Sequence, residues 1–500
     1  MRGWGLGRGG SPCDAGEKCL SAGRKTLHNG SVLLKVPPGV PEGAVSTHLT
    51  IMQNPKTPQT AEKQAASRRQ FIGGAAAAAA AVNLPIEACA QVAGSDELKL
   101  ALVGCGGRGG GAAEQALTSS GTRLVAMADA FAERMEPTLS SLQAKFGNRV
   151  DVPDSRKALG LESFKEVLQH ADVVLLTTPP GFRPMMFKAA VEAGKHVFME
   201  KPVGVDSPGI RMVLENAKVA EQKNLKVVVG LQRRYQANYR AAKEKVKEGM
   251  IGEIIAAQCY WNNAGIWKVD RKPEWKEIQY QVKNWYHFIW LCGDHINEQH
   301  IHNIDVINWF MDGHPVSAQG LGGRAVRNNP KETQIFDHHY VEYTYPNGVI
   351  MNSQCRHQPN CWNAVSEIII GSKGTLYIDG GGGATIKDRA GKTIWRYRQQ
   401  DSDGNPYQNE HNELYAAIRD NKPLNNAYYG AESTFTSILG RYATYSGKMI
   451  KWDEALAWNN SEMPANLAFD APATVNPDKD GNYPVPVPGQ CDPSKAGSYA

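Results

Sequence analysis

The stretch Leu98-Lys-Leu-Ala-Leu-Val-Gly-Cys-Gly-Gly-Arg-Gly109 decides the fold of this chain. Its first half is a short apolar run typical of a buried parallel strand, and its glycines follow with G-x-G-x-x-G spacing. A helical pattern begins at Gly109, and the next apolar run ends in Asp129. The glycine spacing alone is weak in a chain with 50 glycines, but this order of strand, loop, helix and acidic strand end is typical of a dinucleotide-binding unit.

Each glycine of this loop has a physical task in such a unit. Gly104 permits the tight turn, Gly106 lets the backbone approach a pyrophosphate, and Gly109 allows the helix to pack closely on the strand. The helix N-terminus offers free N–H groups to the phosphates. We therefore expect the loop to bind a nicotinamide dinucleotide through Gly104, Gly106, Gly107, Arg108 and Gly109.

Asp129 predicts which dinucleotide is bound. A carboxylate at this strand end accepts hydrogen bonds from the adenosine ribose hydroxyls and repels a 2′-phosphate. Ala130 and Phe131 offer no cation to such a phosphate, so we predict NAD as the cofactor. NADP is the alternative, and Arg134 is the residue that would favour it.

Strands and helices alternate up to residue 230, which predicts an α/β fold with a doubly wound parallel sheet of the Rossmann type over residues 97–230. The expected strands are 98–103, 123–128, 171–177, 196–199 and 226–229. The expected helices are 109–117, 132–146, 184–193 and 209–223.

Residues 231–470 have a different pattern, which predicts an α+β domain with an open, mainly antiparallel sheet. Alternating runs are expected at 253–260, 317–326, 338–345, 349–356, 367–371 and 375–378. Helices are expected at 239–248, from Asp294 onward, and near 408–420 and 431–447. The Pro/Gly-rich tail over 471–500 is predicted to be extended along the surface or mobile.

The N-terminal region resembles an export signal. Ser67-Arg68-Arg69-Gln-Phe-Ile72 precedes an alanine-rich run and the small-residue site Ala88-Cys-Ala90. We predict a twin-arginine signal over 52–90, starting at Met52, with 1–51 as upstream sequence and a periplasmic mature protein. An alanine-rich linker and a lipoprotein anchored through Cys89 are the alternatives.

The bulk composition narrows the partners. The chain has 500 residues, 42% hydrophobic and 21% charged, with a net charge of +5 that is not gathered into basic blocks. Nucleic acid is therefore not an expected partner. The longest apolar run, 75–82, is nearly all alanine, so no membrane span is predicted.

Two further patterns predict reactive groups. Lys201, in Glu200-Lys201-Pro202, follows the strand 196–199 and so lies at the carboxyl edge of the sheet, where ligands bind in open α/β folds. An ammonium there can hydrogen-bond a reacting oxygen, although a surface lysine would fit the same position.

The second pattern lies in 294–312, where His295, Glu298, His302 and Asp305 are predicted to share one helical face. An imidazole can take the proton of a substrate hydroxyl, and a carboxylate beside it can orient the partner group. A solvated helix face and a metal site formed by His295, Glu298 and His302 are the alternatives. We expect no metal, because a lysine and a histidine can together handle the alkoxide.

Together these motifs resemble the glucose-fructose oxidoreductase, inositol dehydrogenase and rhizopine catabolism (Gfo/Idh/MocA) family, from about Lys99 to Trp452. The matching motifs are the glycine loop, Thr178-Pro179-Pro180, Glu200-Lys201-Pro202, Gly230-Leu-Gln-Arg-Arg-Tyr235, Gly249-Met-Ile-Gly-Glu253 and His302-Asn-Ile-Asp305. The resemblance implies that Lys201, Glu298 and His302 surround the nicotinamide, with Thr178, Pro179 and Glu200 among the cofactor contacts. Glu298 departs from the family's usual aspartate.

The resemblance also implies a substrate and an assembly. Sugars, inositols and their derivatives are the family's usual substrates, and the outer face of its second sheet commonly makes a homo-oligomer. Aromatic rings and amides suit a sugar, so we expect substrate contacts from Trp285, Tyr286 and Asn262, together with His295 and Asp305. Core or interface packing is the alternative role for the aromatic residues.

We therefore predict an NAD-dependent oxidoreductase that retains its cofactor and recycles it with a second substrate, since free NAD is scarce outside the cytoplasm. Two alternatives remain open. One is a redox-neutral glycoside hydrolase that acts by transient oxidation and elimination. The other is a non-catalytic sugar-binding protein that retains the nucleotide.

Overall fold

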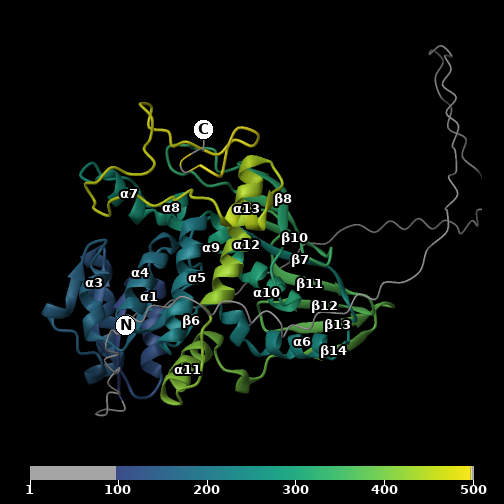
Figure 1. Cartoon of the computed structure of the whole chain (residues 1–500), viewed down its shortest axis with the longest axis horizontal. Coiled ribbons are helices and arrows are strands. Elements are labelled where there is room, and N and C mark those ends of the chain that lie inside the picture. Colours follow the sequence, from purple (N-terminus) through teal and green to yellow (C-terminus); the bar gives the residue numbers. More distant parts are fainter. Residues whose placement is uncertain (1–96, 496, 498–500) are drawn as a thin grey trace, which may run out of the picture. The chain divides into compact units, whose positions relative to one another are not determined.

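Two sheets, one of six strands and one of nine, organise the structure, a computed structural model that describes residues 97–495 and 497 (Figure 1). The first sheet has the order β3-β2-β1-β4-β5-β6, and all its neighbouring strands are parallel. Its strands are β1 (Leu98–Val103), β2 (Thr122–Asp129), β3 (Lys157–Leu159), β4 (Val173–Leu176), β5 (His196–Met199) and β6 (Val227–Val229). The predicted doubly wound parallel sheet is confirmed.

Helices cover both faces of this parallel sheet. Leu100 and Leu102 of β1 face one apolar cluster, and the alternate residues Ala101 and Val103 face the other, as the two-residue period of a strand requires. The helices are α1 (Gly107–Thr118), α2 (Ala132–Phe146), α3 (Phe164–Val167), α4 (Arg183–Glu192) and α5 (Ser207–Gln222).

A helix from the C-terminal part of the chain completes one of these faces. Leu414 and Tyr415 of α11 (Pro406–Arg419) belong to the same apolar cluster as the α1 side chains. Figure 1 shows α11 beside α1 and β6. The predicted boundary at residue 230 thus separates the two sheets, but the chain returns to the first domain after it has built the second.

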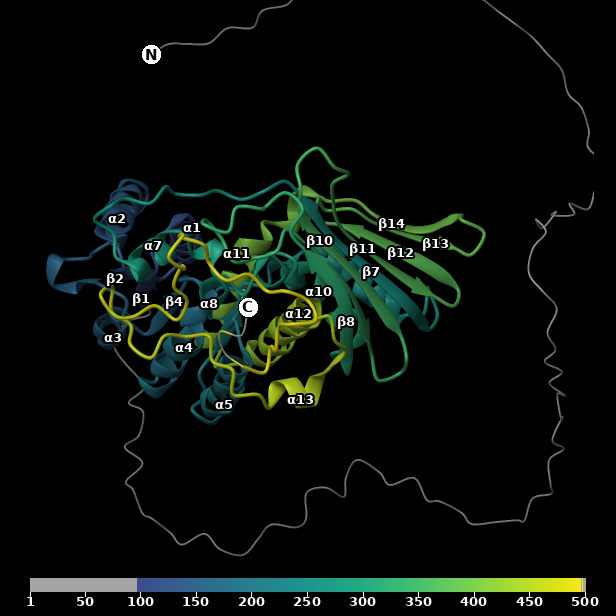
Figure 2. The same ribbon diagram turned by 90° about the horizontal axis from the view of Figure 1, so that it is seen from above.

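The second sheet has the order β14-β13-β12-β11-β7-β10-β9-β8-β15 and is antiparallel except for the β7–β10 pair (Figure 2). Its strands are β7 (Ile254–Asn263), β8 (Ser317–Gly323), β9 (His338–Thr344), β10 (Ile350–His357), β11 (Ala364–Gly371), β12 (Gly374–Asp379), β13 (Ala384–Asp388), β14 (Thr393–Tyr397) and β15 (Ile450–Lys451). The predicted open, mainly antiparallel sheet is confirmed, although β13 and β14 were not predicted and β8 ends before the predicted residue 326.

Helices of the second domain pack against one face of this sheet (Figure 2). They include α6 (Ala237–Lys247), α10 (Ile301–Met311) and α12 (Ala427–Ser446); the remaining helices are α7 (Glu277–Lys283), α8 (Ile289–Cys292), α9 (His295–Glu298) and α13 (Trp452–Leu456). The single helix predicted from Asp294 is wrong: α9 ends at Glu298, and α10 begins at Ile301. This break changes which side chains share a face.

Residues 471–495, the described stretch of the tail, run over α7 and α8 without helix or strand (Figures 1 and 2). Tyr483 is buried there, and its ring packs edge-on against Phe288 at 4.9 Å between centroids. The structure therefore has the first of the two predicted arrangements, an extended tail along the surface.

The predicted signal over 52–90 and the upstream segment 1–51 lie outside the described residues. Within the described part of the chain, no helix combines the length and the apolar character needed to cross a membrane.

Candidate active site

A cavity of about 810 Å³ lies at the carboxyl ends of the parallel strands and extends to the second domain. Val103, Asp129, Thr177 and Glu200, which end or follow β1, β2, β4 and β5, line one part of it. Trp261, Glu298 and His302 of the second domain line another part. Its size is in the range of small-molecule and cofactor sites, roughly 300–1,000 Å³.

The glycine loop has the geometry of a phosphate cradle. A Cβ on Gly109 would lie 1.9 Å from the Gly104 carbonyl oxygen, and Gly104 has φ +92°, so side chains at these positions conflict with the backbone. A Cβ on Gly106 meets no atom within 4 Å and would extend into open space beside the α1 N-terminus. No side chain caps that N-terminus, and no acidic residue lies in its first turn. These residues fit a dinucleotide, because free N–H groups and a positive helix end face an open space.

Asp129 holds the end of β2 next to this loop. Its carboxylate accepts hydrogen bonds from the backbone N–H groups of Cys105 at 2.5 Å and Phe131 at 2.9 Å, and it lines the cavity. Burial raises the pKa of Asp129, while the two N–H donors and the Arg134 charge oppose that shift. Arg134 also lines the cavity, with an exposed side chain.

The remaining predicted cofactor contacts also line this cavity, namely Gly107, Arg108, Thr178, Pro179, Glu200 and Lys201. Two of them are paired, since the Arg108 guanidinium donates to the Glu200 carboxylate. Sequence reasoning missed the partners of this pair on α11. Arg108 lies over the Tyr407 ring at 4.8 Å, and its Nη2 is 3.8 Å from buried Glu410. The sequence of residues 98–231 contains no signal that α11, which begins at residue 406, packs against this domain.

Lys201 contacts Glu298 twice. Its Nζ donates to the Glu298 side-chain Oε1 at 2.8 Å and to the Glu298 backbone oxygen at 2.7 Å. An ammonium has three N–H donors, so one is left for a ligand. Burial raises the pKa of Glu298, although the Lys201 charge opposes that shift.

His302 is buried among positive charges. Burial, followed by the charges of Lys201 and Arg233, lowers the pKa of the His302 imidazole well below its usual value. The Trp261 ring stacks on it at 5.8 Å between centroids. His302 is therefore neutral at physiological pH and able to accept a proton.

Several buried polar atoms around the cavity have no hydrogen-bond partner in the described part of the chain. They are the Trp261 Nε1, Tyr286 hydroxyl, Glu298 Oε2 and His302 Nδ1 atoms. All four residues line the cavity. Since buried polar atoms are normally satisfied, such a cluster around one cavity indicates a polar ligand.

The structure does not bring every predicted substrate residue to this cavity. Trp285 and Tyr286 line it, whereas His295, Asp305 and Asn262 do not. The His295 ring instead packs against the rings of His339 and His357, with centroid distances of 4.8 and 4.3 Å. Asp305 is buried and pairs with Arg234 and Ser433. Asn262 is buried at its position on β7. The prediction that His295, Glu298, His302 and Asp305 share one face is wrong.

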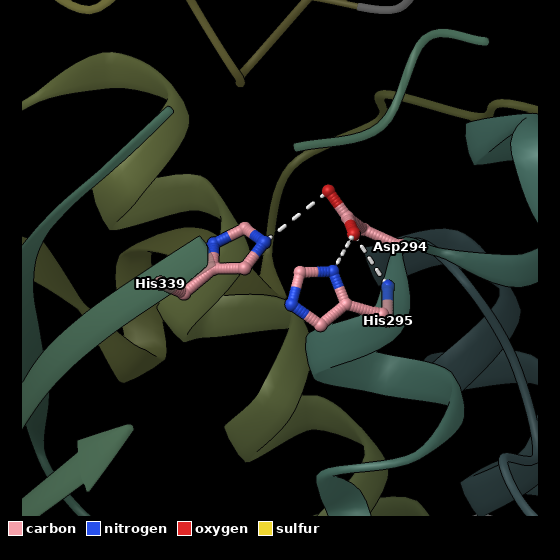
Figure 3. Close-up of side chains that lie close together, drawn as sticks. All are labelled: Asp294, His295 and His339. Atoms are coloured by element: carbon pink, nitrogen blue, oxygen red, sulfur yellow. Dashed lines mark hydrogen bonds and ion pairs between the residues drawn. The ribbon is translucent and has the colours of Figure 1, made fainter. Parts of the chain in front are cut away.

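His295 instead belongs to a second buried cluster, with Asp294 and His339 (Figure 3). The ligand-type atoms of these three residues lie within 4.8 Å of one another. The Asp294 carboxylate already accepts hydrogen bonds from the His295 N–H and Nδ1, the Phe336 N–H and the Tyr445 hydroxyl, and His339 Nε2 is 3.3 Å away. This cluster differs from the metal alternative of His295, Glu298 and His302. Its carboxylate already accepts hydrogen bonds from groups of the protein.

Comparisons with known proteins place the chain in a family. Residues 98–231 match the model "Oxidoreductase family, NAD-binding Rossmann fold", and residues 239–377 match the "GFO/IDH/MocA C-terminal domain". The chain belongs to the Gfo/Idh/MocA family. The predicted membership is confirmed.

Individual Gfo/Idh/MocA relatives match less of the chain. Inositol 2-dehydrogenase 3 of Saccharopolyspora erythraea is 31% identical over 205 residues, 41% of this chain and 51% of that protein. The chain spans about half the length of the curated relatives it matches first.

Two solved structures of similar fold cover more of it. A scyllo-inositol dehydrogenase from Lactobacillus casei with bound NAD(H) and scyllo-inositol has a TM-score of 0.54 and 22% identity, covering 71% of this chain and 99% of that one. An aldose-aldose oxidoreductase from Caulobacter crescentus has a TM-score of 0.56 and 18% identity, with the same coverage. At these identities the likeness establishes the fold alone.

Proposed function

We propose that this protein is an NAD-dependent oxidoreductase that transfers hydride to or from a hydroxyl-bearing carbon of a sugar, inositol or sugar derivative. One observation carries the proposal: a single cavity is lined both by the phosphate cradle and by Lys201, Glu298 and His302. The unpartnered polar atoms of Trp261, Tyr286, Glu298 and His302 on this cavity suit a substrate rich in hydroxyl groups. The relatives named above are inositol and aldose enzymes, which agrees with this class.

The chain's own residues divide the reaction between them. Neutral His302 accepts the proton of the substrate hydroxyl, and the free N–H of Lys201 hydrogen-bonds the same oxygen as negative charge develops on it. Glu298 orients the Lys201 ammonium through its two contacts. NAD, when bound, supplies the acceptor for the hydride that leaves the same carbon. The carbinol becomes a carbonyl, and the steps reverse for reduction.

NAD is favoured over NADP on the position of Asp129. Its partly exposed carboxylate lines the cavity beside the loop, where a 2′-phosphate would face like charge. The test is the ratio of dissociation constants for the two nucleotides in the wild type and in Asp129→Ser. Preference for NAD that weakens in the variant supports the proposal. A wild type that prefers NADP would assign the controlling role to Arg134.

Retention of the nucleotide is proposed from contacts that join three segments beside the cavity. Lys283 of α7 pairs with Glu133 of α2 and lies 3.7 Å from the Phe131 ring, and Phe131 stacks on Phe469, just before the tail, at 5.3 Å between ring centroids. Lys283 and Phe131 both line the cavity. A nucleotide seated on the loop would leave only after these contacts open.

Denaturing the purified protein and identifying the released nucleotide tests both cofactor proposals. We expect one NAD(H) per chain from the wild type, a reduced content from Lys283→Ala, and no change from the exposed control Lys276→Ala. A wild type that releases no nucleotide would contradict retention.

Incubation of the loaded enzyme with sugars, inositols and glycosides tests the activity. Paired oxidised and reduced products, or a net change in nicotinamide absorbance, support the proposed oxidoreductase. Release of an aglycone without net redox change would favour the redox-neutral glycoside hydrolase, and binding without turnover would favour a sugar-binding protein.

Export is proposed from the motif Ser67-Arg68-Arg69 and the small-residue site at 88–90. Expression in a bacterium with a twin-arginine pathway should give a processed periplasmic protein. An Arg68→Lys, Arg69→Lys variant should stay in the cytoplasm unprocessed. Equal processing of both proteins would contradict this route.

A further inference from the structure

Gln299 occupies the break between α9 and α10, directly between Glu298 and the turn that carries His302. It lines the cavity and is partly exposed, while both flanking residues are buried. Its backbone oxygen accepts the His302 N–H at 3.3 Å, so the two residues are tied within one turn. Nothing in the amino-acid spacing singled Gln299 out, and the proposed chemistry does not use it.

The orientation of the Gln299 amide is fixed by a chain of hydrogen bonds behind it. The Arg327 Nη2 atom lies 2.9 Å from His357 Nδ1, and His357 Nε2 lies 2.7 Å from Gln299 Oε1. A guanidinium can only donate hydrogen bonds, so His357 Nδ1 is an acceptor. The one proton of a neutral imidazole must then be on Nε2, where it is donated to the amide oxygen.

Other features of the chain support this arrangement. His357 is buried, and burial together with the charges of His295 and Arg327 lowers its pKa, so the ring is neutral. Arg327 is itself held by a second hydrogen bond, from Nη1 to the Phe336 backbone oxygen. A flipped amide would place its N–H₂ group against the His357 N–H, donor against donor. The oxygen of Gln299 therefore faces His357.

The Gln299 amide nitrogen is available to donate to a ligand. Within 97–495 and 497, the structure records no hydrogen-bond acceptor for Gln299 Nε2. The Trp261 Nε1 and Tyr286 hydroxyl are unpartnered on the same cavity. We propose that Gln299 is a substrate-binding residue that presents its amide N–H₂ as an oriented donor to a second substrate oxygen, distinct from the one held by Lys201 and His302.

This inference rests on the proposed oxidoreductase function and adds a residue that selects its substrate. A site built to donate to an oxygen discriminates strongly against an analogue without that oxygen. Arg327 and His357 act as positioning residues, since His357 contacts Gln299, Arg327 contacts His357, and neither of them lines the cavity.

Steady-state kinetics on nucleotide-loaded enzyme tests the proposal. The probe is the first of myo-inositol, scyllo-inositol and D-glucose that the wild type turns over, together with its monodeoxy analogues. Gln299→Glu keeps an acceptor for His357 but replaces the donor by a carboxylate, and Gln299→Leu removes both. We expect KM to rise by about 10-fold or more in each, with nucleotide content unchanged. The midpoint of thermal unfolding should stay the same in Gln299→Glu and fall in Gln299→Leu, because the leucine leaves the buried His357 Nε2–H without its acceptor. Gln319→Leu, the same change at an exposed position on β8, is the matched control.

The deoxy analogues separate binding from a structural role. One analogue should lose affinity for the wild type but not for Gln299→Leu, because the missing oxygen and the missing amide belong to one contact. Arg327→Met should raise KM in the same direction by a smaller factor, and Arg327→Lys should restore it, since a lysine also donates.

Unchanged KM in the Gln299 variants, or equal losses for every analogue in wild type and Gln299→Leu, would overturn this assignment and leave the oxidoreductase intact. A wild type that holds nucleotide but turns over none of the sugars would instead remove the proposed function, and this inference with it.

Discussion

Two clusters, one around Asp294 and His295 and one around Glu298 and His302, begin within nine residues of the sequence, and their carboxylates are bonded in opposite ways. In the first, the Asp294 carboxylate accepts hydrogen bonds from His295 (Figure 3) and also from Phe336 and Tyr445, and all four residues are buried. In the second, Glu298 and His302 each keep a buried polar atom without a partner and line the cavity. The chemical groups are nearly the same in both.

The pKa values follow this difference. Burial raises the pKa of Asp294, but the neighbouring His339 and His295 and their hydrogen bonds hold it well below its usual value, so the carboxylate is ionised and accepts hydrogen bonds within the fold. Burial raises the pKa of Glu298, and Lys201, which pairs with it, has one N–H donor left for a ligand. The difference lies in the carboxylates: both Asp294 oxygens accept hydrogen bonds within the fold, whereas Glu298 Oε2 has no partner and Glu298 lines the cavity, as a ligand-binding group would.

Replacing His302 gives the largest expected effect. His302→Asn removes the proton acceptor, so kcat/KM should fall by about 10²–10⁴-fold, the usual contribution of a general base. The free energy of unfolding should change by less than about 1 kcal/mol, because the lost ring has an unpartnered nitrogen. Kinetics and urea unfolding on the same preparation measure both. A stable variant with full activity would assign the proton transfer to another group.

Asp294→Asn should have the opposite effect to His302→Asn, a large loss of stability with little loss of activity. An amide cannot accept from all the donors around Asp294, so we expect a loss of about 2–3 kcal/mol in the free energy of unfolding. The folded fraction should keep kcat/KM within about tenfold of the wild type. A variant that is stable but inactive would place the Asp294 cluster in the chemistry and remove the contrast between the two clusters.

The contrast could not be predicted from the sequence, although much of the fold could. The glycine loop and Asp129 are recognised from local spacing, and the parallel strands from apolar runs, so the sequence predicts these features. The 3, 4, 3 spacing of His295, Glu298, His302 and Asp305 assumes one continuous helix. The chain breaks between Glu298 and Ile301, where Gln299 lies 2.7 Å from His357 on a distant strand, and residue spacing contains no such contact.

Two other features were beyond the sequence for different physical reasons. β14 has mostly exposed or half-exposed side chains, so the edge of the sheet lacks the apolar alternation that marks a strand. The helical pattern of α11 predicts its existence, but not its return to the first domain, where Tyr407 and Glu410 contact Arg108. A helix that packs against a domain distant in the sequence leaves no signal in its own sequence of where it will pack.

The pH dependence of kcat/KM is expected to show an effect of intermediate size, between those of the substitutions above and the one that follows. The pKa of His302 is lowered by burial and by Lys201, so its neutral, proton-accepting form persists below the usual imidazole pKa of about 6.5. At pH 5.5 an ordinary imidazole base would lose about tenfold in kcat/KM for oxidation, whereas this enzyme should lose little.

Stability must be measured beside that profile. Burial lowers the pKa of His300 to about 3 and that of His339 to about 4, so both are neutral in the fold. The unfolded chain binds protons on these residues below about pH 6.5, and stability therefore falls as the pH falls. Circular dichroism at each pH identifies where unfolding begins. A kinetic acid limb near 6.5 in folded protein would contradict a depressed pKa for His302.

The smallest expected effect comes from the ring that supports the imidazole. Trp261→Leu removes the stacking on His302, and an aromatic pair of this kind contributes about 0.5–1.5 kcal/mol, so kcat/KM should fall by about 2–10-fold. Tyr445→Phe is the matched change in the other cluster, since it removes one hydroxyl donor to Asp294. It should lower the free energy of unfolding by about 1 kcal/mol and leave kcat/KM unchanged. If Trp261→Leu affects only unfolding, or Tyr445→Phe affects only kinetics, the division between a carboxylate bonded within the fold and groups that face the ligand does not hold, because the supporting contacts would then serve the opposite purposes.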